Sequence, residues 1–87
     1  MEEEKIEGEL IGEVTDFFAK VSAAAIKLSG PLKAGDKIRI KGHTTDLELV
    51  VESMQIGNVS VSEAKAGDDI GVLVKDRVRK RDKVYKV

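Results

Sequence analysis

Two copies of one short segment, Lys-Ala-Gly-Asp, constrain the fold of this chain more than any other feature. They occupy residues 33–36 and 65–68. After the first copy, Ile38 and Ile40 alternate with charged residues. Gly-Asp is typical of a turn, and apolar residues at every second position indicate a strand with one buried face. A looser copy of the pattern begins at Arg81. The sequence therefore predicts short strands that are opened by tight turns.

The same alternation recurs along the chain and indicates six or seven short strands, the pattern of an all-β barrel. We expect strands near residues 10–18, 21–28, 37–41, 47–56, 59–61, 70–74 and 84–87. The segment 21–28 is open to two interpretations, because its three consecutive alanines favour a helix. Its alternation and short length favour a strand, which is the structure we predict. Gly12, inside the first strand, indicates a bulge of the kind that barrel corners need.

Composition limits what such a chain can hold. With 87 residues there is room for one domain, and aromatic residues are only 3% of the chain, so aliphatic side chains must form the core. There is no cysteine and one histidine, which excludes a disulfide framework, a thiolate metal site and a zinc site built from several histidines. We expect no cofactor and no metal. Charged residues make up 36% of the chain, which favours a thermophilic source.

Charge is distributed unevenly between the two ends. Residues 1–16 carry seven acidic side chains and one lysine, whereas residues 75–87 carry seven basic side chains and two aspartates. The two ends can neutralise each other, or the basic end can bind nucleic acid or an acidic partner. We expect a flexible acidic N-terminus over residues 1–8 and a single β-barrel domain over residues 9–87. No apolar run is long enough to span a membrane, and the acidic start is unlike a targeting peptide, which predicts a cytoplasmic protein.

The basic end supplies the candidate nucleic-acid-binding residues. We expect residues 75–83 to form a loop or an edge strand. As a strand, alternation at 75, 77 and 79 would align three cations on one face, where they could meet phosphates. The two aspartates that interrupt this run fit the alternative, a solvated edge that resists aggregation. The candidates are Lys75, Arg77, Arg79, Lys80, Arg81 and Lys83.

A second candidate is the polar turn formed by His43, Thr44, Thr45 and Asp46. It can contact a ligand, or it can be an ordinary hairpin turn whose hydroxyl and carboxylate groups cap the backbone. Its four residues are contiguous, so we expect no catalytic site there. Phe17 and Phe18 are adjacent in a strand and must point to opposite sides, one into the core and the other outward.

The segments GPLKAGDKIRIKG and EAKAGDDIGVLV give the chain a resemblance to a known family. It resembles the second domain of translational GTPases such as elongation factor Tu, over nearly the whole chain. That resemblance implies a closed six- to seven-stranded Greek-key barrel of the translation-protein type. The chain also looks like the small barrel appended to a collagenase-like peptidase family. No phosphate-binding loop is present, because the lysine of GPLKAGDK is misplaced, so we expect no GTP.

From the first resemblance we expect a non-catalytic module that is not an enzyme and that binds RNA or a component of the translation apparatus. The alternative is an accessory protein-protein interaction domain of a larger complex. In either case we expect a monomer or a weak oligomer with no membrane partner.

Overall fold

The computed structural model describes residues 8–43, 45–57 and 59–87, and these form an all-β structure. The predicted flexible N-terminus lies outside the described residues except for Gly8. The described residues form ten strands. These are β1 (Glu9–Phe18), β2 (Ala23–Leu28), β3 (Leu32–Lys33), β4 (Lys37–Lys41), β5 (Asp46–Val50), β6 (Met54–Ile56), β7 (Val59–Val61), β8 (Glu63–Ala64), β9 (Asp69–Leu73) and β10 (Lys83–Lys86).

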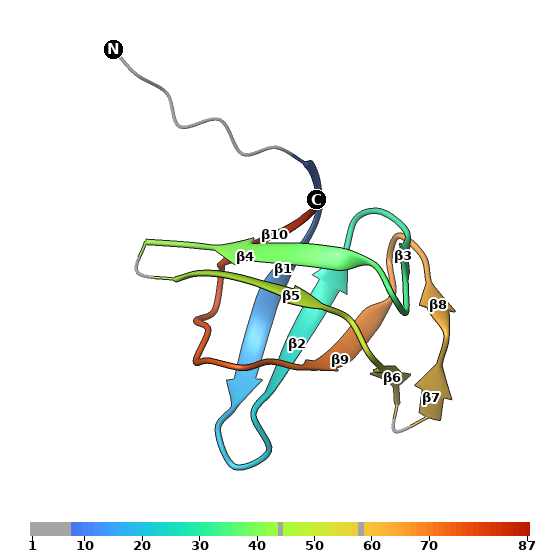
Figure 1. Ribbon diagram of the computed structural model, residues 1–87. Coiled ribbons are helices and arrows are strands. Elements are labelled where there is room, and N and C mark those ends of the chain that lie inside the picture. The colour runs from blue at the N-terminus through green and yellow to red at the C-terminus, as the bar shows by residue number, and fades with distance from the viewer. Residues whose placement is uncertain (1–7, 44, 58) are drawn as a thin grey trace.

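Eight of these strands form one curled sheet, in the order β5-β4-β10-β1-β2-β9-β6-β7, and β3 pairs with β8 in a second, small sheet (Figure 1). The prediction of an all-β fold is confirmed. The finer expectation of a closed six- to seven-stranded Greek-key barrel is not met, because the described ladders leave β5 and β7 as the two ends of the sheet. The sheet is a half-barrel with an open side.

The physical reason for the open side lies at Val51. Residues 47–56 were expected to form one strand, but β5 ends at Val50 and β6 begins at Met54. The N–H of Val51 donates to the Asp36 carbonyl at 2.9 Å, and its carbonyl accepts from Gly35 at 2.7 Å. These two hydrogen bonds hold Val51 against the 33–36 turn, so β5 ends at the preceding residue. Val51 is fully buried there, which stabilises the bend.

The segment with two interpretations is a strand, as predicted. It begins at Ala23, after a turn over residues 19–22, and pairs with β1 on one side and β9 on the other. Ala24 is fully buried and lies opposite Phe17, which packs partly buried against the core. Because paired residues point to the same side of a sheet, the small alanine leaves room for the ring of Phe17. Three alanines in a row therefore reflect packing rather than helix formation.

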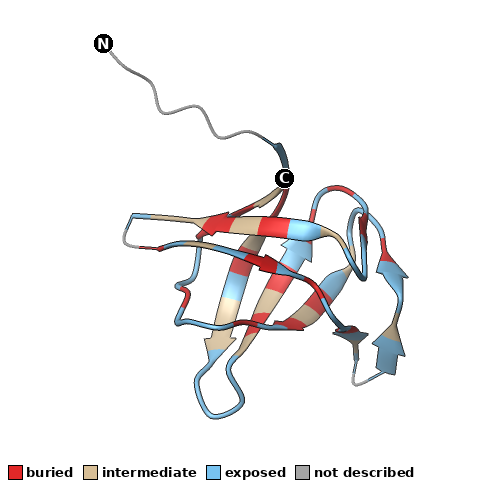
Figure 2. Ribbon diagram, viewed as in Figure 1, coloured by how far each residue is buried: buried red, intermediate tan, exposed pale blue. Residues whose placement is uncertain are grey.

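The core is aliphatic, as composition required. Buried residues alternate with less buried ones along the strands of the curled sheet (Figure 2). Each fully buried aliphatic side chain contributes about 1.5–3 kcal/mol relative to an exposed one. Gly12 lies at a register shift in the β1–β10 ladder, and a Cβ there would lie 2.9 Å from Ile26, so the predicted bulge with close approach is confirmed. The main core members are Ile11, Ile26, Leu28, Leu32, Ile38, Ile40, Met54, Val72, Val78 and Val84.

One turn is built three times, at residues 33–36, 65–68 and 79–82. In each, the aspartate N–H donates to the carbonyl three residues earlier, and the aspartate carboxylate accepts the N–H of that same earlier residue at 2.8–3.0 Å. The third residue has a positive φ, of 97° at Gly35, 95° at Gly67 and 77° at Arg81. These are the features of a type II turn closed by an aspartate. The looser third copy is therefore real, although an arginine occupies the glycine position.

Each of the three turns also holds a buried residue from elsewhere in the chain by two backbone hydrogen bonds. The third turn residue donates its N–H to the carbonyl of that buried residue, whose own N–H donates to the aspartate carbonyl. The buried partners are Val51, Leu28 and Val14, respectively, and the six bonds measure 2.7–2.9 Å. This repeat sets where β4, β9 and β10 begin, so the Lys-Ala-Gly-Asp pattern organises the sheet as well as its turns.

Candidate functional site

The predicted cationic residues lie on a loop rather than on a strand face. β9 ends at Leu73 and β10 begins at Lys83, so residues 74–82 connect two strands. Of the two expectations for this stretch the loop is correct, and the alignment of 75, 77 and 79 on one strand face is wrong. The reason is that Val78 is buried and the 79–82 turn clamps Val14, which bends the segment over the open end of the sheet. All six predicted cations are exposed, and Lys83 pairs with Glu13 at 3.4 Å. Their role in nucleic-acid binding stays a prediction.

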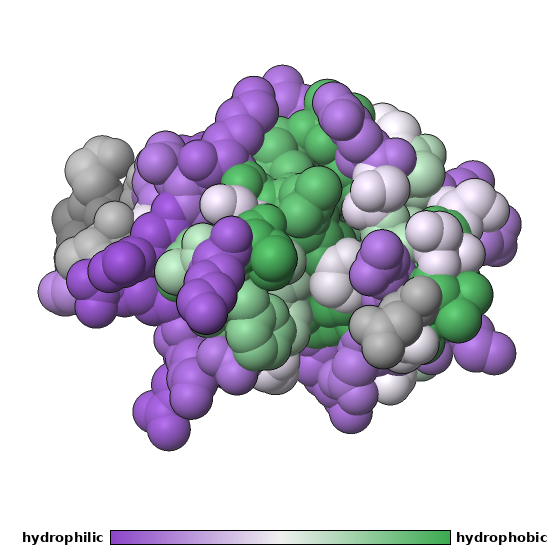
Figure 3. Space-filling model, turned by 90° about the horizontal axis from the view of Figure 1, so that it is seen from below, coloured by the Kyte–Doolittle hydropathy of each residue, from purple (hydrophilic) through white to green (hydrophobic). Residues whose placement is uncertain are grey.

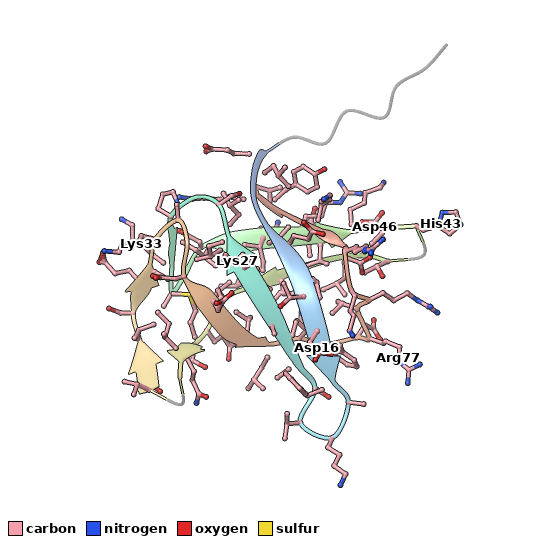
Figure 4. All side chains as sticks on the ribbon, turned by 180° about the vertical axis from the view of Figure 1, so that it is seen from behind. Asp16, Lys27, Lys33, His43, Asp46 and Arg77 are labelled. Atoms are coloured by element: carbon pink, nitrogen blue, oxygen red, sulfur yellow. The ribbon has the colours of Figure 1, made fainter. Side chains whose placement is uncertain are left out.

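The polar turn does not bring its side chains together. His43 is exposed at the tip of the β4–β5 hairpin, beyond Asp46 (Figure 4), and Thr44 lies outside the described residues. Thr45 is buried, and its carbonyl accepts the N–H of Gly42 at 2.7 Å. Asp46 accepts two hydrogen bonds of 2.9 Å from the Arg39 side chain. These bonds lower the pKa of Asp46 below its ordinary value and hold its carboxylate on the hairpin. Ligand contact by this turn stays a prediction.

The two phenylalanines divide as predicted, and the outward one borders an apolar face. Phe18 is 51% exposed, and Val21 and Leu73 are each 61% exposed. Phe18 pairs with Ala23, which pairs in turn with Leu73 across β1, β2 and β9. Figure 3 shows the molecule from below, with apolar surface bordered by hydrophilic side chains. An exposed apolar area of this kind indicates a contact surface.

A hollow of about 320 Å³ lies beside this face. Gly71 and Ala23 line it, and a Cβ added at Gly71 would meet no atom within 4 Å, so the hollow exists because these side chains are small. Ser53 and Gln55 also line it and can offer hydroxyl and amide groups to a bound chain. Small residues and a few polar groups around an apolar rim suit a polypeptide better than a highly charged ligand.

A second feature follows the open side of the half-barrel. A hollow of about 180 Å³ separates the end of β5 from residues 73–75, and another of about 220 Å³ separates the start of β5 from residues 76–77. We call the two hollows together the seam. Leu49, Val50 and Leu73 line one part, and Asp46 and Arg77 line the other. Sequence reasoning missed the seam, because it forms between segments that are far apart in the chain.

Residues 8–43, 45–57 and 59–87 contain no group of three or more His, Cys, Asp or Glu side chains placed to hold a metal ion. Within the same ranges there is no helix of the length and apolarity needed to cross a membrane. The cytoplasmic location and the monomeric or weakly oligomeric state stay predictions.

The sequence is similar to proteases and to a bacterial collagenase. It is 49% identical over 76 residues to an uncharacterized protease of Methanocaldococcus jannaschii, which covers 86% of this chain and 19% of the relative. It is 33% identical over 78 residues to the collagenase of Porphyromonas gingivalis, covering 87% of this chain and 22% of the relative. The chain thus spans about a fifth of the length of these relatives. No family model matches the sequence.

The fold is also found among solved structures. The C-terminal domain of a Geobacillus thermoleovorans protein described as a U32 peptidase superposes with a TM-score of 0.85 and 16% sequence identity, over 91% of this chain and 92% of that chain. A selenomethionine variant of that domain superposes with a TM-score of 0.86, again at 16% identity, over 90% of this chain and 99% of that chain. At this identity the likeness establishes the fold.

These findings overturn the first resemblance and agree with the second. The relatives are named as a protease and a collagenase, not translation factors, so the predicted RNA-binding or translation-apparatus module is wrong. The prediction that the protein is not an enzyme is corrected as well, because these relatives are named as enzymes. The Lys-Ala-Gly-Asp segments do not identify a translation factor, because they specify a type II turn that any barrel-like sheet of this geometry can use.

Proposed function

We propose that this chain is the β domain of a collagenase-like peptidase of the U32 type and that it contributes to proteolysis by contacting the polypeptide substrate. The observation that carries the proposal is the 49% identity over 76 residues to the Methanocaldococcus jannaschii protease. The shared fold of the Geobacillus thermoleovorans C-terminal domain supports it. Because the chain spans about a fifth of its relatives, proteolysis is assigned to the peptidase of which the domain forms a part.

The geometry that favours substrate contact is the apolar face with its hollow at Gly71. Phe18 and Leu73 are exposed on the face, and the hollow offers space for small apolar side chains. Burying apolar area there gains roughly 25 cal/mol per Å², and the polar groups of Ser53 and Gln55 can pair with a peptide backbone.

A domain exchange tests the proposal. The 78-residue matched segment of the Porphyromonas gingivalis collagenase is replaced by this chain, and cleavage of fluorescein-labelled gelatin is measured beside the collagenase that lacks the segment. We expect the exchanged enzyme to cleave gelatin and the deleted enzyme to be at least about 10-fold slower, the equivalent of about 1.4 kcal/mol. Equal loss in both enzymes, with the exchanged domain shown to be folded by circular dichroism, would contradict the proposal.

A matched pair of substitutions tests the hollow itself. Gly71→Val places a side chain in the hollow, and its Cβ would meet no atom within 4 Å. Lys27→Val places the same side chain at an exposed position farther along β2. In the exchanged enzyme we expect Gly71→Val to raise the KM for gelatin and Lys27→Val to leave it unchanged. Equal KM values for the two variants would mean that the hollow does not contribute to gelatin binding.

A further inference from the structure

Strand β7 forms one end of the eight-stranded sheet, and its outer edge has no partner strand among the described residues (Figure 1). Val59 is 61% exposed, and Ser60 is exposed as well. Natural sheets usually protect such an edge with charged side chains or proline, and β7 contains neither. The strand at the other end of the sheet, β5, carries Asp46 and Glu48. β7 is therefore the end of the sheet that is open to another strand.

The ladders beside β7 determine which of its backbone groups point outward. In an antiparallel ladder, successive residues bond alternately to the strands on their two sides. At one end of the β2–β9 ladder, Val74 donates to the Ser22 carbonyl at 2.8 Å, so the even-numbered residues of β9 bond to β2 and Gly71 bonds toward β6. Its partner there is Gln55, whose backbone groups therefore face β9. Ser60 lies opposite Gln55 on the other side, so its N–H and C=O groups point away from β6, to the free edge.

The sequence of β7 reads the same in both directions about Ser60, because a valine flanks it on each side. A second copy can add antiparallel at this edge, about a twofold axis through Ser60. The two Ser60 residues then exchange both of their N–H to C=O hydrogen bonds, and Val59 lies beside Val61 of the second copy. Val61 packs partly buried against the core, so the exposed Val59 gains a neighbour that is already anchored.

Charge does not oppose this pairing. In the same register Glu63, the acidic residue nearest to β7, comes opposite Gly57 of the second copy. The two Glu63 side chains are then about 20 Å apart along the strands, beyond the screening length at physiological salt. An uncharged edge selects neither an acidic nor a basic strand, whereas its symmetric sequence matches a copy of itself.

We propose that two copies of this chain associate through β7 and form one continuous sheet across a twofold axis at Ser60. The contact is smaller than a standard protein interface, so we expect a weak dimer with a Kd between about 10 µM and 1 mM. Gly71, Gln55 and Ser60 lie in one row, so the dimer places its two hollows on the same face of the sheet, about 24 Å apart. The pairing goes beyond the proposed function, and only the use of both hollows by one long substrate rests on it.

The first test is a disulfide at the axis. The chain contains no cysteine, so Ser60→Cys supplies a single thiol. The Cα atoms of a hydrogen-bonded antiparallel pair are about 5.5 Å apart, within the range that a disulfide bridges. Ser29→Cys is the control, because it places the same thiol at an exposed serine outside β7. In a glutathione redox buffer we expect at least about 10-fold more linked dimer from Ser60→Cys, measured by non-reducing electrophoresis. Equal yields would overturn the pairing at Ser60.

The second test removes the outward backbone donor. Ser60→Pro deletes an N–H that points away from β6, whereas Ser60→Thr changes the side chain and keeps that N–H. Analytical ultracentrifugation of the 87-residue chain gives the dimer Kd, and circular dichroism confirms that each variant is folded. We expect Ser60→Pro to weaken association at least about 10-fold and Ser60→Thr to change it less than about 3-fold.

The third test separates the β7 edge from the apolar face. Val59 and Val21 are each 61% exposed, and of the two only Val59 lies on β7. We expect Val59→Lys to weaken association at least about 10-fold and Val21→Lys to change it less than about 3-fold. The reverse order would show that the copies meet through the face near Phe18, and the proposal would be wrong.

Two further outcomes overturn the inference. An unaltered chain that stays monomeric at about 1 mM has no such dimer. If Ser60→Pro does not change self-association but slows gelatin cleavage by the exchanged collagenase, β7 pairs with another segment of the peptidase rather than with a second copy. In either case the proposed function is unaffected, because the domain exchange and the Gly71→Val variant test it separately.

Discussion

Replacing Asp82 with alanine removes the only one of the three turn-closing carboxylates that is buried. Asp82 is 4% exposed, and its carboxylate accepts the Arg79 N–H at 2.8 Å. The equivalent bonds of Asp36 and Asp68, at 2.9 and 3.0 Å, are exposed, so water can take the place of the lost carboxylate there. The same chemical deletion is thus made in two environments within one molecule.

The expected costs follow from that difference. Losing a solvent-accessible hydrogen bond costs about 0.5–1.5 kcal/mol, which is the expectation for Asp36→Ala and Asp68→Ala. At Asp82 the Arg79 N–H loses a charged acceptor in a partly buried setting, for which about 2–3 kcal/mol is the appropriate range. For a chain of this size each kcal/mol lowers Tm by roughly 4–8 °C, so Asp82→Ala should melt at least about 8 °C below the unaltered protein.

Urea unfolding followed by circular dichroism, together with thermal melts, measures the series. Asp82→Asn is the control, because the amide oxygen can still accept the Arg79 N–H, and it should recover part of the loss. The reasoning fails if Asp82→Ala costs no more than Asp68→Ala, since burial would then contribute nothing to the bond. It also fails if Asp82→Asn is as unstable as Asp82→Ala.

Two further predictions concern single residues of known geometry. Arg81 has a φ of 77°, a conformation that costs a non-glycine residue roughly 1–2 kcal/mol. In urea unfolding, Arg81→Gly should therefore leave the free energy of unfolding unchanged or raise it by up to about 1 kcal/mol. A clear loss of stability would show that the arginine side chain stabilises the turn. Asp46 has a lowered pKa because of Arg39, so its contribution is fully present above the unfolded-state pKa of about 3.9 and is lost as pH falls through the lower folded-state pKa. The stability gap between the unaltered chain and Arg39→Gln should therefore narrow on acidification through that window, and NMR titration should give a higher Asp46 pKa in the variant. If the stability difference between the two proteins does not change with pH, the Arg39–Asp46 ion pair is not its cause.

Local chemistry explains which parts of the fold were predictable. The strands and the Lys-Ala-Gly-Asp turns follow from side chains within four residues of each other, and even the third turn was visible as a loose copy near Arg81. Placing Phe17 and Phe18 on opposite sides followed from the strand period, although only packing against the core decided that Phe17 is the inner one. The strand 23–28 was predictable from the alternation of Ala24, Ile26 and Leu28 despite its alanines.

The candidate site was less predictable, because it depends on which segments meet. A loop was one of two expectations for the segment that carries the six cations, but its course follows from the burial of Val78 and Asp82, which no periodicity signals. His43 and Asp46 are near neighbours in sequence, yet Arg39 holds Asp46 to β4 while His43 stands at the hairpin tip. The family assignment failed for a related reason: a turn motif reports backbone geometry, and that geometry is shared by unrelated barrels.

The sequence by itself determined that this chain forms short aliphatic strands separated by aspartate-closed turns, because both properties arise from contacts between close neighbours in the chain. Only the tertiary structure decided that the sheet stays open between β5 and residues 73–77. The opening exists because the 33–36 turn captures Val51 and ends β5, an event that joins residues fifteen or more positions apart. Long-range hydrogen bonds of this kind leave no trace in local spacing, and in the described ladders they leave β5 at one end of the sheet.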